Sequence, residues 1–198
     1  MIGRSYRTAR GLRDRWVDAG WTRSARLAVD LPPFVWLTGR GTTIAGNRLR
    51  TWQPSHGLVH HLEAVTNVRL LLDRQLRLGR WECERSIARR LRSDSPLRAH
   101  LPDAILHAPE KVAIEVELTL KSRSRLEKIV TDLSLDNDQV WYFARGRLHR
   151  VLSELAADNP LGNITVHRYP PRAAEVVASS LYEASLASRI ASSNWPVE

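Results

Sequence analysis

Residues 102–121 read PDAILHAPEKVAIEVELTLK and predict two β-strands joined by a short connection. The first strand, PDAILHA, opens on a Pro-Asp pair, and Pro109 and Glu110 separate it from the second. The second strand, KVAIEVELTL, is rich in β-branched residues, and its side chains alternate between two rows. A strand places successive side chains on opposite faces of a sheet, so the two rows face in opposite directions.

The second strand therefore has one apolar face and one mostly polar face. The apolar row is Val112, Ile114, Val116, Leu118 and Leu120, and the other row is Ala113, Glu115, Glu117, Thr119 and Lys121. Asp103 on the first strand joins the polar row if the connection has an odd number of residues. A three-residue connection over 108–110 places Asp103 opposite Glu115, whereas an even connection places it on the wrong face.

Carboxylates on two adjacent strands suit a hard divalent cation. Mg²⁺ takes oxygen donors, keeps several waters, and needs only one or two protein carboxylates beside a substrate phosphate. Asp103 and Glu115 are therefore the candidate ligands for Mg²⁺ or Mn²⁺. Lys121 is a candidate contact for the attacking water or the phosphate, and Glu84 is a candidate further ligand or base.

The rest of the chain after residue 54 alternates helical and extended patterns. The expected elements are a helix over 55–79, a short helix over 84–92, the two strands above, a helix opened by Ser122, a strand over 139–144, a helix over 145–159, a strand over 164–169 and a C-terminal helix over 172–190. This order predicts a mixed α/β fold, a mixed sheet flanked by helices. The core is expected to cover 55–171, followed by the C-terminal helix and tail over 172–198.

The first 54 residues form a separate, strongly basic segment. SYRTARGLRDRWVDAG predicts a helix stopped by Gly20, and RLAVDLPPFVWLTGRG predicts two strands around Pro32 and Pro33. Residues 53–55 are the expected joint to the core, with Ser55 as the cap of the next helix. Arginines concentrate in this segment, and the candidate contacts for DNA phosphates are Arg7, Arg10, Arg13, Arg15, Arg23 and Arg26.

The overall composition favours an anionic partner. The chain of 198 residues carries 30 Lys and Arg against 21 Asp and Glu, a formal net charge of +9, and nucleic acid is the commonest partner of such a surplus. The single cysteine, Cys83, excludes a disulfide framework and fits a reducing cytoplasm. No apolar run approaches the roughly 18 residues that span a bilayer, so we expect no membrane partner.

Several of these segments together resemble a known family. VHHLEAVTNVRLLL, the pattern Trp81-x-x-Glu84-Arg85, HLPDAIL, VAIEVELTLKSRSRLEKI and VWYFA are similar to the replication-relaxation family of actinobacterial plasmids and mobile elements, within the PD-(D/E)xK nuclease-like superfamily. The resemblance covers about residues 56–170. It implies a Mg²⁺-dependent phosphodiesterase site with Asp103 and Glu115 on the metal, Lys121 beside them and Glu84 in support.

The N-terminal segment has a resemblance of its own. RTARGLRDRWVDAGW followed by RLAVDLPPFVWLTGRG is similar to the recognition helix and wing of a winged helix-turn-helix domain, whose first two helices have no counterpart in this sequence. A truncated winged helix of this kind implies binding of double-stranded DNA. A lone helix of this length is marginal in water, so we expect it to dock elsewhere, to dimerise, or to belong to a chain that starts further upstream. A homodimer or a larger DNA-processing assembly is a candidate partner.

Two functions stay open at this point. The superfamily motif ends in Glu-x-Lys, but here Glu117 stands in the lysine position and Lys121 follows four residues later. Glu117 then serves as base or second ligand in a DNA endonuclease. Alternatively, the departure marks a non-catalytic DNA-binding module whose degenerate nuclease-like core is an assembly platform.

Overall fold

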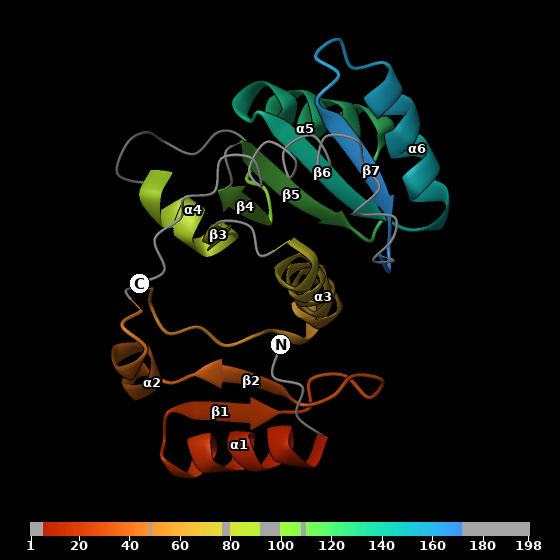
Figure 1. The fold of residues 1–198 in the computed structure, drawn as a ribbon. Coiled ribbons are helices and arrows are strands. Elements are labelled where there is room, and N and C mark those ends of the chain that lie inside the picture. The colour runs from red at the N-terminus through yellow and green to blue at the C-terminus, as the bar shows by residue number, and fades with distance from the viewer. Residues whose placement is uncertain (1–5, 48, 77–79, 92–99, 108–109, 172–198) are drawn as a thin grey trace. The chain divides into compact units, whose positions relative to one another are not determined.

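The computed structural model describes residues 6–47, 49–76, 80–91, 100–107 and 110–171 (Figure 1). The chain separates into two compact units, residues 1–63 and 64–198. The division falls inside helix α3, Val59–Leu76, beyond the joint expected at 53–55. The C-terminal helix expected over 172–190 lies outside the described residues. Among the described helices, none combines the length and the apolar character needed to cross a membrane.

The first unit holds a helix followed by a two-stranded sheet. Its elements are α1 (Tyr6–Asp18), β1 (Thr22–Ala25), β2 (Phe34–Leu37), α2 (Gly39–Ile44) and η1 (His56–Leu58). The helix predicted before Gly20 is confirmed, and Gly20 takes the left-handed conformation with φ of 71°. β1 and β2 pair antiparallel, with Ala25 opposite Phe34. Proline residues 32 and 33 lie in the connection, as expected.

Two local predictions for this unit are wrong. The first strand occupies Thr22–Ala25, earlier than the sequence from Arg26 suggested, because the extended pattern there belongs to the long connection. Gly39 begins α2 directly after β2, because the Thr38 side chain accepts a hydrogen bond from the Gly41 amide and caps the helix. Ser55, the expected cap of the following helix, makes no side-chain cap bond.

The second unit is a five-stranded mixed sheet with helices on both faces, which confirms the mixed α/β prediction. The strands are β3 (Arg80–Cys83), β4 (Ala104–His107), β5 (Lys111–Glu117), β6 (Gln139–Ala144) and β7 (Ile164–Arg168). They lie in the order β3-β4-β5-β6-β7, antiparallel from β3 to β5 and parallel from β5 to β7. β5 therefore has an antiparallel neighbour on one side and a parallel neighbour on the other.

The two faces of this sheet are covered by different helices. Ala64, Val68 and Leu72 of α3 pack on the face that carries Ile114 and Phe143. Helices α5 (Arg123–Asp136) and α6 (Gly146–Ala157) pack on the opposite face, where Ala113 and Tyr142 lie (Figure 1). Leu126, Ile129, Val130 and Leu133 form the buried face of α5. Ser122 opens this helix as expected, because its hydroxyl accepts a hydrogen bond from the Arg125 amide.

The register of β4 and β5 follows the three-residue connection over 108–110. Ala104 pairs with Ile114, and His107 pairs with Lys111. Continuing this register by one residue places Asp103 opposite Glu115, on the face that also carries Ala113. The odd connection on which the candidate site depends is thus the one that this protein adopts.

Candidate functional site

The sequence-predicted carboxylates gather at one edge of the five-stranded sheet. Asp103 directly precedes β4, and Glu115 and Glu117 lie in the last half of β5. Because β4 and β5 run antiparallel, the start of one strand meets the end of the other. This is also the edge at which the parallel strand β6 ends, a common location for binding sites in α/β sheets.

Asp103 connects the two strands beyond the last backbone pair. Its Oδ2 accepts a hydrogen bond of 2.7 Å from the Val116 amide, and its own amide donates to Glu115 Oε2 at 3.3 Å. The Asp103 side chain thus supplies a hydrogen-bond acceptor for the Val116 amide beyond the end of the backbone ladder between β4 and β5. Pro102 has no amide hydrogen, which also favours the end of the ladder here.

Glu115 is a buried carboxylate, with 4% of its surface exposed. Its Oε1 lies 2.8 Å from His100 Nε2. Burial, followed by the negative charge of Asp103, raises the pKa of Glu115 to about 7, although the bond to His100 opposes the shift. The same hydrogen bond raises the pKa of His100. His100 has no predicted role in the sequence, and its signal there is only its position three residues before Asp103.

Glu117 is equally buried and bonds to Lys121. Lys121 was expected to share the polar row of a longer strand, but β5 ends at Glu117. The chain turns through residues 118–121 instead, and this turn carries the ammonium back to the Glu117 carboxylate. Thr119 supports the turn, because its amide and hydroxyl both donate to Glu117 Oε1 at 3.3 Å. The Lys121 ammonium thus meets Glu117 through a turn, and not along the polar row of a longer strand as expected.

Tyr142 is a further polar residue that the sequence did not indicate. It pairs in register with Glu115 on β6, and only 1% of its surface is exposed. Burial raises the pKa of the Tyr142 phenol, and the charges of Glu115 and Glu117 raise it further. Within the part of the chain that the structure describes, the buried hydroxyl has no hydrogen-bond partner. The phenol therefore remains a neutral donor on the side of the sheet where the carboxylates lie.

Glu84 reaches this edge through its backbone. It is the first residue of α4, Glu84–Leu91, and its amide donates to the Asp103 carbonyl at 2.9 Å. Its side chain is exposed. The structure therefore places the backbone of Glu84 beside that of Asp103, while the Glu84 side chain is exposed to solvent.

A third buried carboxylate, Glu82, holds α4 against the sheet. Its oxygens accept from Arg90 at 3.2 Å and lie 2.8 Å from His107 Nε2. Burial alone would raise the pKa of Glu82, but the hydrogen bonds from Arg90 and His107 outweigh burial and lower it. This cluster joins β3, β4 and α4, so it fixes the helix on which Glu84 lies.

The donor set at the sheet edge fits a hard cation in chemistry. Asp103 and Glu115 offer carboxylate oxygens, and a bound cation would offset the cost of burying one carboxylate beside another. In the described ranges, no group of three or more His, Cys, Asp and Glu residues is arranged to hold a metal ion. Two protein carboxylates, completed by waters and a phosphate, remain within the ordinary range for Mg²⁺.

The candidate DNA-binding arginines all lie in the first unit. Arg7, Arg10, Arg15, Arg23 and Arg26 are exposed. Arg13 differs, because its guanidinium donates to Asp14 Oδ1 at 2.8 Å through Nε and is only partly exposed. Arg10 lies 4.0 Å from the same carboxylate, a long surface pair that costs little to break. Arg13 is therefore the least available of the six for phosphate contacts.

Comparisons with known protein families, with curated proteins and with solved structures found no match for this chain.

Proposed function

We propose that this protein binds double-stranded DNA and cleaves phosphodiesters with Mg²⁺ or Mn²⁺, as a relative of the PD-(D/E)xK nuclease-like superfamily. The observation that carries the proposal is the register of β4 and β5, which sets Asp103 against the buried Glu115. A role in replication, nicking or relaxation of plasmid or mobile-element DNA is part of the same proposal, and it rests on the resemblance to the replication-relaxation family alone.

Each residue of the site has a distinct role in this proposal. The carboxylates of Asp103 and Glu115 would hold the cation, which when bound activates water and offsets negative charge on the phosphate. Glu117 accepts the proton of the attacking water, and the ammonium of Lys121, already bonded to Glu117, then moves to a phosphate oxygen. The P–O bond to the leaving oxygen breaks as the new P–O bond forms, and the leaving oxygen takes a proton from solvent.

The Asp103→Ala variant tests the cleavage proposal. We expect the wild-type protein to nick supercoiled plasmid with Mg²⁺ or Mn²⁺, and the variant to be slower by roughly 100-fold or more, since it loses a metal ligand. Agarose gel electrophoresis of the relaxed and linear products measures the rate. Asp132→Ala is the matched control, because Asp132 lies on α5 in a surface pair with Lys128. Equal nicking by the wild type and Asp103→Ala, or no nicking by the wild type, would reject the proposal that this protein cleaves DNA.

The first unit is proposed to carry the DNA contacts, as a partial winged helix whose protein partner is a second copy or a larger assembly. Its residues 1–63 include 10 Arg and no Lys against 3 Asp and 1 Glu, or 10 − 4 = +6 of the total +9. Arginine side chains on α1 and β1 supply charge without reading sequence. This concentration of charge supports electrostatic binding of the phosphate backbone.

The salt dependence of DNA binding tests this second part. We expect duplex affinity to fall steeply with salt, and the triple variant Arg7→Gln, Arg10→Gln, Arg15→Gln to reduce the slope of log affinity against log salt by roughly 0.9 per lost contact. Fluorescence anisotropy with a labelled duplex measures the slope. Arg123→Gln, an exposed arginine of α5, is the control and is expected to leave the slope unchanged. A duplex affinity that is independent of salt would contradict the proposal.

One observation favours a non-catalytic alternative, a DNA-binding module with a nuclease-like core that serves as an assembly platform. Lys121 is bonded to Glu117, and His100 is bonded to Glu115, so the chain's own side chains engage both carboxylates. In this alternative the polar cluster is structural. The plasmid assay separates the two functions, because a platform binds DNA without nicking it.

A further inference from the structure

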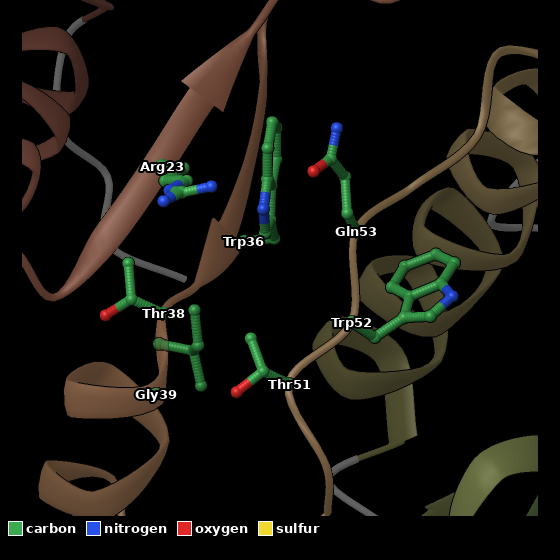
Figure 2. A pocket seen from close by; sticks show the side chains of 8 residues that line it. Arg23, Trp36, Thr38, Gly39, Thr51, Trp52 and Gln53 are labelled. Atoms are coloured by element: carbon green, nitrogen blue, oxygen red, sulfur yellow. The ribbon is translucent and has the colours of Figure 1, made fainter.

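An open hollow in the first unit combines an aromatic side chain with hydrogen-bonding and charged groups. It has a volume of about 280 Å³, and Figure 2 shows Trp36 between Arg23 and Gln53, with Thr38 and Thr51 nearby. The indole of Trp52 points away from Trp36. Trp36 is therefore the aromatic surface that this hollow offers to a ligand.

The strand register explains why Arg23 and Trp36 meet. They are directly opposite each other on β1 and β2, so their side chains lie on the same face of the two-stranded sheet. Arg23 is exposed and Trp36 is half-buried, so the guanidinium and the indole both reach solvent. Gln53 approaches from the extended segment after α2 and adds an amide with both donors and an acceptor.

A second hollow adjoins the first at the same residues. It has a volume of about 630 Å³ and shares Arg23, Trp36, Thr38 and Gln53 with it. Thr22 also lines this second hollow, and its buried hydroxyl has no hydrogen-bond partner among the described residues. Trp36 thus lines two hollows that share four residues, and we call this pair of hollows the groove around Trp36. Binding surfaces that extend over more than one pocket suit a polymer better than one small molecule.

The positive charge of Arg23 in the lining of both hollows favours an anionic ligand. The Trp36 indole and the Arg23 guanidinium line the first hollow, and neither hollow has a carboxylate among its described lining residues. A cationic ligand, which aromatic surfaces often bind, would be repelled by Arg23. A ligand that joins a flat ring to an anion matches the indole, the amide and the guanidinium together. A nucleotide has these parts, and its ring is accessible only when the base is unpaired.

We infer that the groove around Trp36 binds unpaired nucleotides of single-stranded DNA, with a base stacked on the Trp36 indole and a phosphate near Arg23. The inference rests on the proposed function for the identity of the partner, and it adds that the bound DNA has a single-stranded segment. Stacking of bases on aromatic side chains tolerates any sequence, because every base has a flat face.

Binding of a labelled single-stranded oligonucleotide, with a duplex of equal length beside it, tests the inference in buffer that contains EDTA. We expect Trp36→Ala to weaken single-strand binding by about tenfold and to leave duplex binding unchanged. Trp36→Phe should keep most of the affinity, and Gln53→Ala, an exposed substitution, should weaken single-strand binding selectively. Trp16→Ala is the aromatic control, since Trp16 lies on α1, 39% exposed, and lines neither hollow.

The outcomes separate this inference from the proposed cleavage. Two results would overturn the proposal that the groove binds unpaired nucleotides. One is unchanged single-strand affinity in Trp36→Ala, and the other is an equal loss of affinity for both DNAs in a variant with wild-type circular dichroism. If Trp36→Ala does not fold, Gln53→Ala decides in the same way. Failure of plasmid nicking does not affect a binding assay performed in EDTA. A wild-type protein that binds neither DNA overturns both the proposed single-strand site and the proposed DNA partner.

Discussion

The Glu115→Gln variant is expected to be more stable than the wild-type protein at pH 8, by about 3 kcal/mol, in buffer that contains EDTA. The pKa of Glu115 is raised from 4.5 to about 7, so the folded protein binds more protons than the unfolded chain between these values. The free energy of unfolding therefore falls as the pH rises from about 4.5 to about 7. The raised pKa of His100 acts in the same direction, because its stabilisation is also lost as the pH rises.

Urea unfolding of both proteins at pH 5 and pH 8 measures this effect. At pH 5 Glu115 is protonated in the folded state but only partly protonated in the unfolded chain, so the difference in stability should shrink to about 1 kcal/mol or less. Glu127→Gln is the control, because Glu127 is exposed on α5 in a pair with Arg123. A variant that is less stable than the wild type at pH 8 would show that Glu115 is stabilised, not strained, in its buried position. The same variant should lose plasmid nicking, so stability and activity are expected to change in opposite directions.

The Gly41→Ala variant is expected to lose about 3 kcal/mol or more of stability in the first unit. A Cβ atom at Gly41 would lie 1.8 Å from the Trp21 carbonyl oxygen and 2.8 Å from its carbonyl carbon. That carbonyl cannot easily move, because it accepts hydrogen bonds from the Thr38 amide at 3.0 Å and the Thr38 hydroxyl at 3.1 Å. The substitution therefore separates α2 from the segment between α1 and β1. Thermal unfolding by circular dichroism measures the loss.

Gly39→Ala provides a matched control in the same helix. The nearest atom to a Cβ at Gly39 is Thr51 Oγ1 at 3.8 Å, an ordinary contact. We expect this change to be neutral or slightly stabilising, since alanine favours a helix over glycine. Duplex binding should fall in Gly41→Ala and persist in Gly39→Ala, because the arginines lie in the same unit as Gly41. Similar melting curves for the two variants would contradict the close approach of Gly41 to Trp21.

Local patterns were enough to predict most of the sheet. Alternation in residues 111–117 predicts the two faces of β5, but the sequence left open whether the connection before it is odd or even. The observed register settles this point and places Asp103 opposite Glu115. The apolar spacing of α5 and the cap at Ser122 are equally local signals. β3 was not predicted, because its four residues show no clear period until they pair with β4.

The site was less predictable than the sheet, for reasons of three-dimensional contact. Lys121 meets Glu117 through a turn, whose path depends on hydrogen bonds from Thr119 and not on strand alternation. His100 lies three residues before Asp103 but bonds to Glu115 on the next strand, and Tyr142 pairs with Glu115 from β6. Neither partnership can be read from the local sequence. Burial of Glu115, which raises its pKa, arises from helices packed over the sheet and has no counterpart in the local sequence.

The connection between β4 and β5 lies at the opposite end of these strands from the carboxylates. From Lys111 to Glu117, β5 has 7 residues, which at roughly 3.3 Å each gives a separation of about 20 Å. Glu110, exposed beside that connection, is thus a suitable attachment point for a dye or a surface linker. A single protein molecule anchored there would keep its acidic edge free to engage DNA, so dwell times and nicking events could be followed on the same immobilised copy.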